Sequence, residues 1–326
     1  MHLMPFIAAL AFAFVPAFAM ACFVYWLDRY EKEPLILLGA AFAWGAVVAA
    51  GGSYVLNTVF GLSIYAFTGS GELADQATSS LVAPVVEEAL KGGALLAIFL
   101  AFRQEFDSIL DGIIYAGITA LGFAASENVM YIYEYGYVEG GWQGFLQMVL
   151  IRDLVVAWQH PFYSAFTGIG LAFARLHRGV LVKLVATTVG FSCAVLTHGF
   201  HNSFLGVIGG LEGSVLESMI DWAGWLLMAT FIVFMISRER GLMEMHLRDE
   251  VTSGVLSARQ YARALSPWTI SFAWVTGGAT AARFYKLCGE LAHKKSQMMR
   301  LGEEKGNHAL ISSLRGELAK LSPRVS

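Results

Sequence analysis

Charged residues are scarce in this chain of 326 residues: Asp, Glu, Lys and Arg make up 14%, against 56% for hydrophobic residues. A soluble globular domain has about a quarter charged residues, so the composition excludes a disordered chain and an ordinary cytosolic enzyme. The net charge of -3 indicates no general attraction to nucleic acid, and we expect no such partner. The three cysteines, Cys22, Cys193 and Cys288, are too far apart to predict a disulfide framework or a paired-cysteine metal site.

The few basic residues are distributed very unevenly. Of the 22 Lys and Arg residues, 8 precede Ser237 and 14 follow Ile236. The sequence therefore predicts two parts, a transmembrane core at residues 1–236 and a basic cytoplasmic helical tail at residues 237–326. In the tail we expect solvated or lipid-facing basic helices, with a regulatory or substrate-docking role as the alternative.

Long apolar runs dominate the first part. A helix that crosses a bilayer needs about 20 mostly apolar residues, because unpaired backbone groups are costly in lipid. We therefore expect an all-α polytopic bundle of about seven transmembrane helices. The predicted spans are Met4–Leu27, Leu35–Phe60, Thr78–Phe102, Ile109–Tyr133, Phe145–Ala174, Leu184–Ile208 and Ser218–Ser237. The fifth is long enough to tilt or to break at Pro161.

The connections between these spans alternate in charge. Lys and Arg occur in the first, third and fifth connections and in none of the others. Because cytoplasmic loops collect Lys and Arg, we expect a multi-pass protein of the cell membrane with its N-terminus outside and its C-terminus in the cytoplasm. An eighth span at Trp268–Tyr285 is the alternative, but it would export the basic end of the tail. We interpret that segment as a cytoplasmic helix, compatible with a position on the membrane surface.

Ionisable side chains inside spans cost at least about 2.5–3.5 kcal/mol each on insertion scales, so they mark functional sites by default. In this chain they gather in four adjacent spans, the third to the sixth. They are Glu87, Glu88, Lys91, Asp111, Glu127, Arg152, Asp153, His160, His198 and His201, accompanied by the amides of Asn128 and Asn202. Scattered accidents would not cluster in this way.

Helical spacing aligns several of these groups. Glu87 and Lys91 are four residues apart on one helix face, as are His198 and Asn202. Small residues recur every fourth position in two of the same spans, at Gly112, Ala116, Ala120 and Ala124 and again at Ser164, Gly168 and Ala172. Small residues let helices approach closely in lipid, so the helices that carry the polar groups are predicted to pack tightly together.

Such a set of groups is suited to activating water. One Glu of the pair accepts a proton from water. The imidazoles then either bind a metal ion that acidifies its water, or His198 and Asn202 donate hydrogen bonds to a developing oxyanion. Both routes lead to hydrolysis of an acyl bond.

Structural roles are the alternatives for individual residues. Glu87 with Lys91 is also explained as a neutralising ion pair. His201 is explained as an interhelical hydrogen-bond donor, and Asp111 as a helix cap. Arg152 and Asp153 are explained as a buried pair or as interfacial anchors.

Several motifs, in this order, resemble the PrsW family of intramembrane proteases, within the superfamily that includes the CAAX prenyl endopeptidases and bacteriocin-immunity-like membrane proteins. They lie at Asp28–Pro34 (DRYEKEP), Ala83–Lys91 (APVVEEALK), Asp111–Asn128 (DGIIYAGITALGFAASEN), His160 in WQHPFYSAFTGIGLAFAR, and His198–Asn202 (HGFHN). The resemblance covers roughly residues 25–205. It is specific because three of its motifs, EExxK, GFxxxEN and HxxxN, all fall in predicted spans.

The resemblance implies an intramembrane endopeptidase that cleaves a membrane-associated protein, with a membrane-anchored anti-sigma factor as the family's best-known substrate. It implies Glu87 as the water-activating base and Glu88 as its orienting partner, with Asn202 completing the catalytic set. Glu127, His160 and His198 are the implied metal ligands, for Zn²⁺, although relatives described as glutamate proteases use no catalytic metal. Two other classes remain: a proton-coupled transporter, and a non-catalytic scaffold or immunity-type membrane protein.

Overall fold

The chain is described by a computed structural model at residues 3–208, 210–303 and 306–325. Within these ranges all regular secondary structure is helical and no strand occurs, which confirms the predicted all-α class. The chain divides into two compact units. The first comprises the chain up to Val24, Pro34–Arg175 and Gly179–Ala229; the second comprises Tyr25–Glu33, Leu176–Arg178 and the chain from Thr230 onward.

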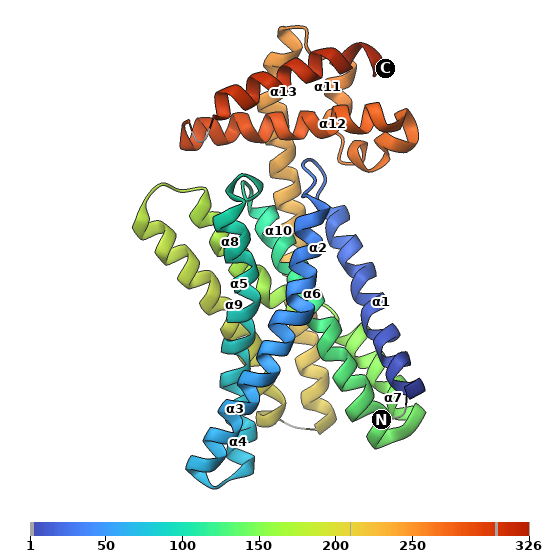
Figure 1. Ribbon diagram of the computed structural model, residues 1–326, viewed down its shortest axis with the longest axis vertical. Helices are drawn as coiled ribbons and strands as arrows, with labels where there is room; N and C mark the ends of the chain where they lie inside the picture. Colours follow the sequence, from blue (N-terminus) through green and yellow to red (C-terminus); the bar gives the residue numbers. More distant parts are fainter. Residues whose placement is uncertain (1–2, 209, 304–305, 326) are drawn as a thin grey trace. The chain divides into compact units, whose positions relative to one another are not determined.

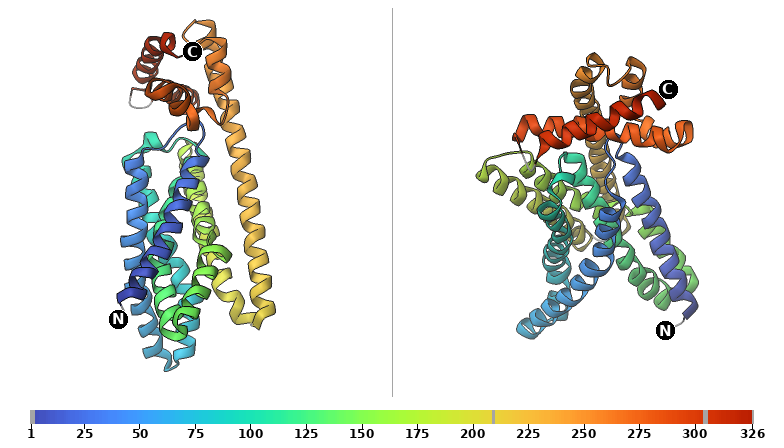
Figure 2. Two further views of the ribbon diagram at one scale, coloured as in Figure 1. Left: turned by 90° about the vertical axis from the view of Figure 1, so that its right-hand side faces the viewer. Right: turned by 45° about the horizontal axis from the view of Figure 1, so that its top comes forward.

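The first unit is a bundle of helices, several of which run beside one another (Figures 1 and 2). Its helices are α1 (Leu3–Leu27), α2 (Leu35–Ala43), α3 (Ala50–Thr68), α4 (Gly71–Ala77), α5 (Ala83–Ala101), α6 (Ile109–Met130), α7 (Glu139–Leu150), α8 (Gln159–Arg175), α9 (Val180–Ile208) and the first part of α10 (Gly210–Thr252). Short π-helical segments connect several of them: η1 (Trp44–Ala49), η2 (Thr78–Val82), η4 (Tyr131–Val138) and η5 (Ile151–Val155).

Five stretches are long and apolar enough to cross a membrane, judged by length and composition among the described residues. They are Leu3–Leu27, Leu35–Thr68, Ile109–Arg175, Val180–Ser203 and Glu212–Thr252. The third stretch contains two of the predicted spans. The predicted span Thr78–Phe102 corresponds to η2 and α5, and it is not among the five because Glu87, Glu88 and Lys91 interrupt its apolar character. The protein is thus a helical membrane protein, and seven spans stay a prediction.

The expected break near Pro161 lies slightly earlier in the chain. Segment η5 ends at Val155 and α8 begins at Gln159, so the break falls at residues 156–158. Pro161 sits in the first turn of α8. Proline is tolerated there because the first amides of a helix have no intrahelical acceptor.

Helix α6 is the centre of the first unit, with every residue from Leu110 to Ala125 buried. It approaches α8 most closely at two glycines: a Cβ added to Gly112 would lie 2.3 Å from the carbonyl oxygen of Gly168, and one added to Gly168 would lie 2.0 Å from that of Gly112. Only glycine fits at either position. The predicted tight packing of the small-residue stripes is therefore confirmed.

The start of α6 is fixed by a capping box. The side chain of Ser108 accepts a hydrogen bond from the amide of Asp111, and Asp111 Oδ2 accepts one from the amide of Ser108 at 2.6 Å. The capping role expected for Asp111 is confirmed, at the third helical position rather than at the N-cap itself.

The second unit contains the tail helices α11 (Ala258–Ala264), α12 (Thr269–Leu301) and α13 (Asn307–Leu321), and the end of α10. Helix α12 bends at Gly278, which has a φ of +69° that only glycine adopts readily. Its Leu287, Cys288 and Leu291 are fully buried among apolar residues of the other helices. The tail is thus a packed helical unit, because apolar faces of its helices bury one another. A solvated or lipid-facing outer surface of these helices stays a prediction.

The first inter-span loop belongs to this second unit. The carbonyl oxygen of Tyr30 lies so close to α12 that a Cβ added to Gly289 would be 1.9 Å from it. The Tyr30 hydroxyl donates to the carbonyl of Leu265 at 3.1 Å, and Glu31 pairs with His293 at 2.8 Å. The motif around residue 30 thus serves as a docking point for the tail helices.

Candidate active site

A cavity of about 1510 Å³ lies within the first unit. Most of the polar residues singled out from the sequence line this cavity. Those that line it are Glu87 from α5, Glu127 from α6, Arg152 from η5, His160 from α8, and His198, His201 and Asn202 from α9. The fold therefore brings side chains that are more than 100 residues apart in sequence to one hollow inside the apolar bundle.

The adjacent glutamates of α5 differ sharply in their surroundings. Glu88 does not line the cavity and its side chain is fully buried. Its Oε1 lies 2.5 Å from Lys91 Nζ and 3.0 Å from His198 Nδ1, and its Oε2 accepts from Ser164 Oγ at 2.8 Å. Both carboxylate oxygens of Glu88 thus have bonding partners.

Glu87, by contrast, faces the cavity. Its Oε1 lies 3.4 Å from the Asn57 amide nitrogen, while its buried Oε2 has no hydrogen-bond partner among the described residues. That oxygen lies 3.7 Å from Nε2 of His198. Glu87 therefore presents a free carboxylate oxygen to any water or ion in the cavity.

His160 connects the two carboxylate sites. Its Nδ1 is 3.2 Å from Lys91 Nζ and its Nε2 is 2.9 Å from Glu127 Oε2. Glu127 also pairs with Arg152, whose Nε donates to Asn128 Oδ1 at 2.6 Å. A continuous polar chain thus runs from Arg152 through Glu127, His160, Lys91, Glu88 and His198 to Glu87. Buried charges in it are paired, as burial in a bilayer requires.

The pairing of Arg152 differs from the expected buried pair with Asp153. Arg152 pairs with Glu127, and Asp153 instead accepts from the Asn128 amide at 3.4 Å. Residues 152 and 153 follow each other, so their side chains point in different directions around the helical segment. Arg152 is therefore a constituent of the site.

Asn202 lines the same cavity, but the structure does not bond it to the glutamates and histidines. Its amide nitrogen donates to the carbonyl of Ser79 at 2.9 Å. One amide hydrogen is therefore engaged in joining α9 to η2. The structure thus brings together Glu87, Glu88, Glu127, His160 and His198, and leaves Asn202 to one side.

A second polar group of the cavity, formed between α8, α9 and α10, is not predicted by the sequence. His201 Nδ1 lies 3.1 Å from Glu217 and 3.0 Å from Asp221. Gln159 Nε2 donates to Asp221 at 2.7 Å. The interhelical hydrogen-bonding role weighed for His201 is confirmed. The signal in the sequence was Glu217 and Asp221, four residues apart at the start of an apolar run.

Three of the residues are arranged to hold a metal ion. One ligand atom from each of Glu87, His160 and His198 lies within 4.8 Å of the others. One carboxylate with two imidazoles is the donor set of several catalytic zinc sites. The unpartnered Glu87 Oε2 and the bond from His198 Nδ1 to Glu88 fit such a site, since metal-bound histidines usually donate their other nitrogen to a carboxylate. Glu127 is not in this group; it contacts His160 and Arg152 instead.

Comparison with known proteins gives the same family that the sequence motifs resemble. The model of a family described as PrsW family intramembrane metalloprotease matches residues 33–236. A protein named Protease PrsW from Geobacillus kaustophilus is 23% identical over 190 residues, which are 58% of this chain and 76% of that protein. Protease PrsW of Bacillus subtilis is 24% identical over 234 residues, 70% of this chain and 90% of its own length.

A third relative, Protease PrsW of Clostridioides difficile, is 36% identical over 114 residues, which are 34% of this chain and 46% of that protein. No solved structure matches the chain. The family match includes all the residues of the polar chain and ends at residue 236, so the tail from residue 237 lies outside it. The chain belongs to the PrsW family of intramembrane metalloproteases and is a membrane peptidase.

Proposed function

We propose that this protein cleaves a peptide bond in a membrane-anchored protein with a water molecule that Glu87 activates in the cavity. The observation that carries the proposal is the asymmetry between the two glutamates: Glu87 has an unpartnered oxygen facing the cavity, and Glu88 is fixed by Lys91, Ser164 and His198. Glu88 is then a positioning residue, because it orients His198 and neutralises Lys91 without reaching the cavity.

The chemistry follows from general base catalysis. The Glu87 carboxylate accepts a proton from water, and the oxygen of that water attacks the carbonyl carbon of the peptide bond. The bond from carbon to nitrogen then breaks, and the proton passes from Glu87 to the leaving amine. Arg152, held beside the cavity by Glu127 and Asn128, supplies positive charge to the site. Such preorganised charge is most effective where water is largely excluded.

A zinc ion would be held by His198, the free oxygen of Glu87 and a ring nitrogen of His160, which would give up its bond to Lys91 or Glu127 for the metal. It would supply Lewis-acid activation of water. A neutral His198 that donates through Nδ1 to Glu88 would carry its lone pair on Nε2, which lies 3.7 Å from Glu87 Oε2. This arrangement supports Glu87 as the carboxylate ligand in preference to Glu127. Without a metal, the same oxygen of Glu87 serves as the base.

The substrate class that we propose is a membrane-anchored protein, with an anti-sigma factor as the class that the family resemblance implies. The proposed location is the cell membrane, with the N-terminus outside and the tail in the cytoplasm. The alternation of basic and acidic connections supports this orientation.

Cleavage is tested without knowing the substrate by mapping new protein N-termini in a bacterial host. Membranes from cells expressing the wild type, Glu87→Gln or the control Glu139→Gln are compared by mass spectrometry of terminal peptides. Glu139 is exposed at the start of α7, so its substitution removes a carboxylate without touching the cavity. We expect new termini with the wild type and the control, and at least a hundredfold fewer with Glu87→Gln, on the order of the loss of a general base. Equal termini in all three samples would refute the role of Glu87.

Metal content is a separate prediction. Protein purified in detergent is expected to contain about one zinc per chain, reduced at least tenfold in His160→Ala and His198→Ala. His308→Ala is the control, because this residue lies on α13 outside the first unit. Measurement by inductively coupled plasma mass spectrometry decides. If the wild type contained no metal and still cleaved its substrates, the mechanism in which Glu87 alone activates water would hold. If both histidine variants kept the metal, its ligands would be other residues.

A further inference from the structure

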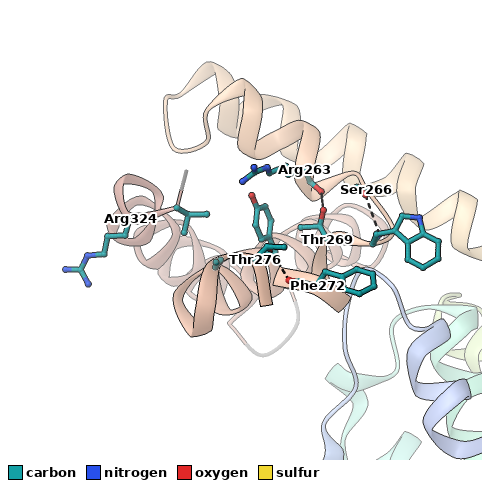
Figure 3. Close-up of a pocket in the computed structure, with 11 residues that line it drawn as sticks. Arg263, Ser266, Thr269, Phe272, Thr276 and Arg324 are labelled. Atoms are coloured by element: carbon teal, nitrogen blue, oxygen red, sulfur yellow. Dashed lines mark hydrogen bonds between the residues drawn. The ribbon is translucent and has the colours of Figure 1, made fainter. Parts of the chain in front are cut away.

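A second cavity, of about 470 Å³, lies entirely within the tail unit. It is enclosed by the end of α11, the turn that follows, both segments of α12 around its bend at Gly278, and the chain at Arg324 and Val325 (Figure 3). It lies outside the segment matched by the family and shares no residue with the cavity described above. Its function is therefore not explained by peptide hydrolysis.

The inside of this cavity is cationic and rich in hydroxyl groups. Arg263 extends toward its centre, whereas the guanidinium of Arg324 points away (Figure 3). The hydroxyl-bearing residues are Ser266, Thr269, Thr276 and Tyr285. Thr269 and Thr276 donate to the carbonyls of Arg263 and Phe272, whereas the buried Tyr285 hydroxyl has no hydrogen-bond partner among the described residues. Tyr285 is 3% exposed; burial raises the pKa of its hydroxyl, and the positive charges of Arg263 and Arg259 oppose this rise. None of the residues that line the cavity is acidic, so the lining is complementary to an anion and not to a cation.

The rim of the cavity is apolar. Trp268 and Phe272 line it, and each is 51% exposed. Trp274 and Val275, on the same segment of α12, are 69% and 75% exposed. Large exposed apolar side chains next to one another mark an interaction surface. A small soluble anion would leave this rim unused, whereas an amphiphile with an anionic head would use both parts.

The rim is also tied to the end of a membrane helix. The Trp268 ring lies 5.6 Å from that of Trp26, in the last turn of the apolar helix α1. The guanidinium of Arg29 lies 3.2 Å from the centre of the Trp26 ring and 4.7 Å from that of Trp268, and it donates to Ser271 at 3.3 Å. These residues all belong to the second unit. A tryptophan at the end of a span, as Trp26 is, sits at the level of the lipid headgroups. Trp268 contacts the Trp26 ring and is therefore expected near the same level.

We propose that the cavity is a binding site for an anionic phospholipid from the bilayer that α1 enters. The phosphodiester binds the guanidinium of Arg263 and accepts a hydrogen bond from the Tyr285 hydroxyl, and the acyl chains lie along Trp268 and Phe272. An arginine beside a hydroxyl donor is well suited to phosphate. No acidic side chain occurs among the described residues of the lining, which disfavours a zwitterionic lipid, because its cationic end would find no acidic side chain there.

The test uses the full chain in detergent, titrated with dioleoyl phosphatidylglycerol or dioleoyl phosphatidylcholine and followed by native mass spectrometry. The variants are Arg263→Gln and, with a smaller change, Tyr285→Phe. Arg248→Gln is the matched control, because Arg248 is also in the second unit, carries the same charge and is 77% exposed in its side chain. Inorganic phosphate and glycerol phosphate are added as soluble competitors, and thermal unfolding confirms that each variant is folded.

We expect one phosphatidylglycerol molecule to bind more tightly than phosphatidylcholine. Its affinity should fall about fivefold in Arg263→Gln, as for one basic contact at a membrane surface, fall less in Tyr285→Phe, and stay unchanged in Arg248→Gln. Equal affinity for the two lipids, or equal weakening by Arg263→Gln and Arg248→Gln, would overturn the proposal. Displacement of the lipid by millimolar inorganic phosphate would also overturn it, since the site would then belong to a soluble phosphate.

Discussion

At the scale of single residues, Lys91 holds the candidate active site together. Its side chain is fully buried, and its ammonium group contacts Glu88, His160 and, at 4.4 Å from the ring centre, the face of Phe123. A lysine in such a place has no access to water, so its charge is balanced entirely by the protein. Its removal would leave Glu88 as an uncompensated charge in an apolar bundle.

We therefore predict that Lys91→Met lowers the free energy of unfolding by about 3–5 kcal/mol, the usual effect of removing one partner of a buried ion pair. The double variant Glu88→Gln with Lys91→Met should lose less than the sum of the two single losses, because no charge is then left unpaired. Thermal unfolding in detergent measures both. The exposed Lys320→Met is the control, expected to stay within about 0.5 kcal/mol of the wild type. Strict additivity would show that the pair is not coupled.

At the scale of elements, the site depends on how closely α6 and α8 approach each other. Helix α8 carries His160 and Ser164, and α6 carries Glu127. Their bonds to one another and to Glu88 are possible only at the separation that Gly112 and Gly168 permit. A larger residue at this contact would move the polar groups of one helix away from those of the other.

Gly168→Ala is accordingly expected to destabilise the protein by about 1–3 kcal/mol, as overpacking of a close contact does, and to reduce the number of new N-termini in the proteolysis assay. Gly39→Ala is the matched control, because a Cβ at Gly39 meets no atom within 4 Å. The comparison is made by thermal unfolding together with the terminal-peptide assay. If both alanine variants behaved like the wild type, the close approach of α6 and α8 would not be required.

The sequence predicts well what depends on position along one helix. The stripes that contain Gly112 and Gly168 and the capping role of Asp111 are both of this kind. The ion pair weighed between Glu87 and Lys91 is wrong, because Lys91 pairs with Glu88, three residues before it. The sequence does not predict which groups meet across helices. Arg152 pairs with Glu127 rather than Asp153, and Gln159 donates to Asp221. Those contacts depend on the rotation and depth of each helix, which periodicity leaves undetermined.

At the scale of the whole molecule, the chain combines a peptidase core with a tail unit outside the family match. The tail could not be predicted as a packed unit, because its core includes a loop more than 200 residues away in sequence. Local pattern reveals the amphipathic faces of the tail helices, but it does not reveal that Tyr30 lies among them.

The proposed orientation is testable at this scale. Alkaline phosphatase fused after Gly140 should be active, since that connection is expected outside, and inactive when fused after Gly179. Green fluorescent protein at the same two points should show the opposite pattern, because it fluoresces only when folded in the cytoplasm. A reversed pattern would place the tail outside the cell and contradict the orientation predicted from the Lys and Arg residues of the connections.

The contact between Tyr30 and Gly289 has a consequence for the order in which the protein is made. A ribosome that adds about 5–20 residues per second reaches α12 roughly ten to fifty seconds after it has made the first loop. Until then Tyr30, which is 1% exposed in the finished unit, has no cover. The last helices to be synthesised therefore enclose one of the first segments, and a nascent chain that stalls before α12 would display this loop to the proteases that remove incomplete membrane proteins.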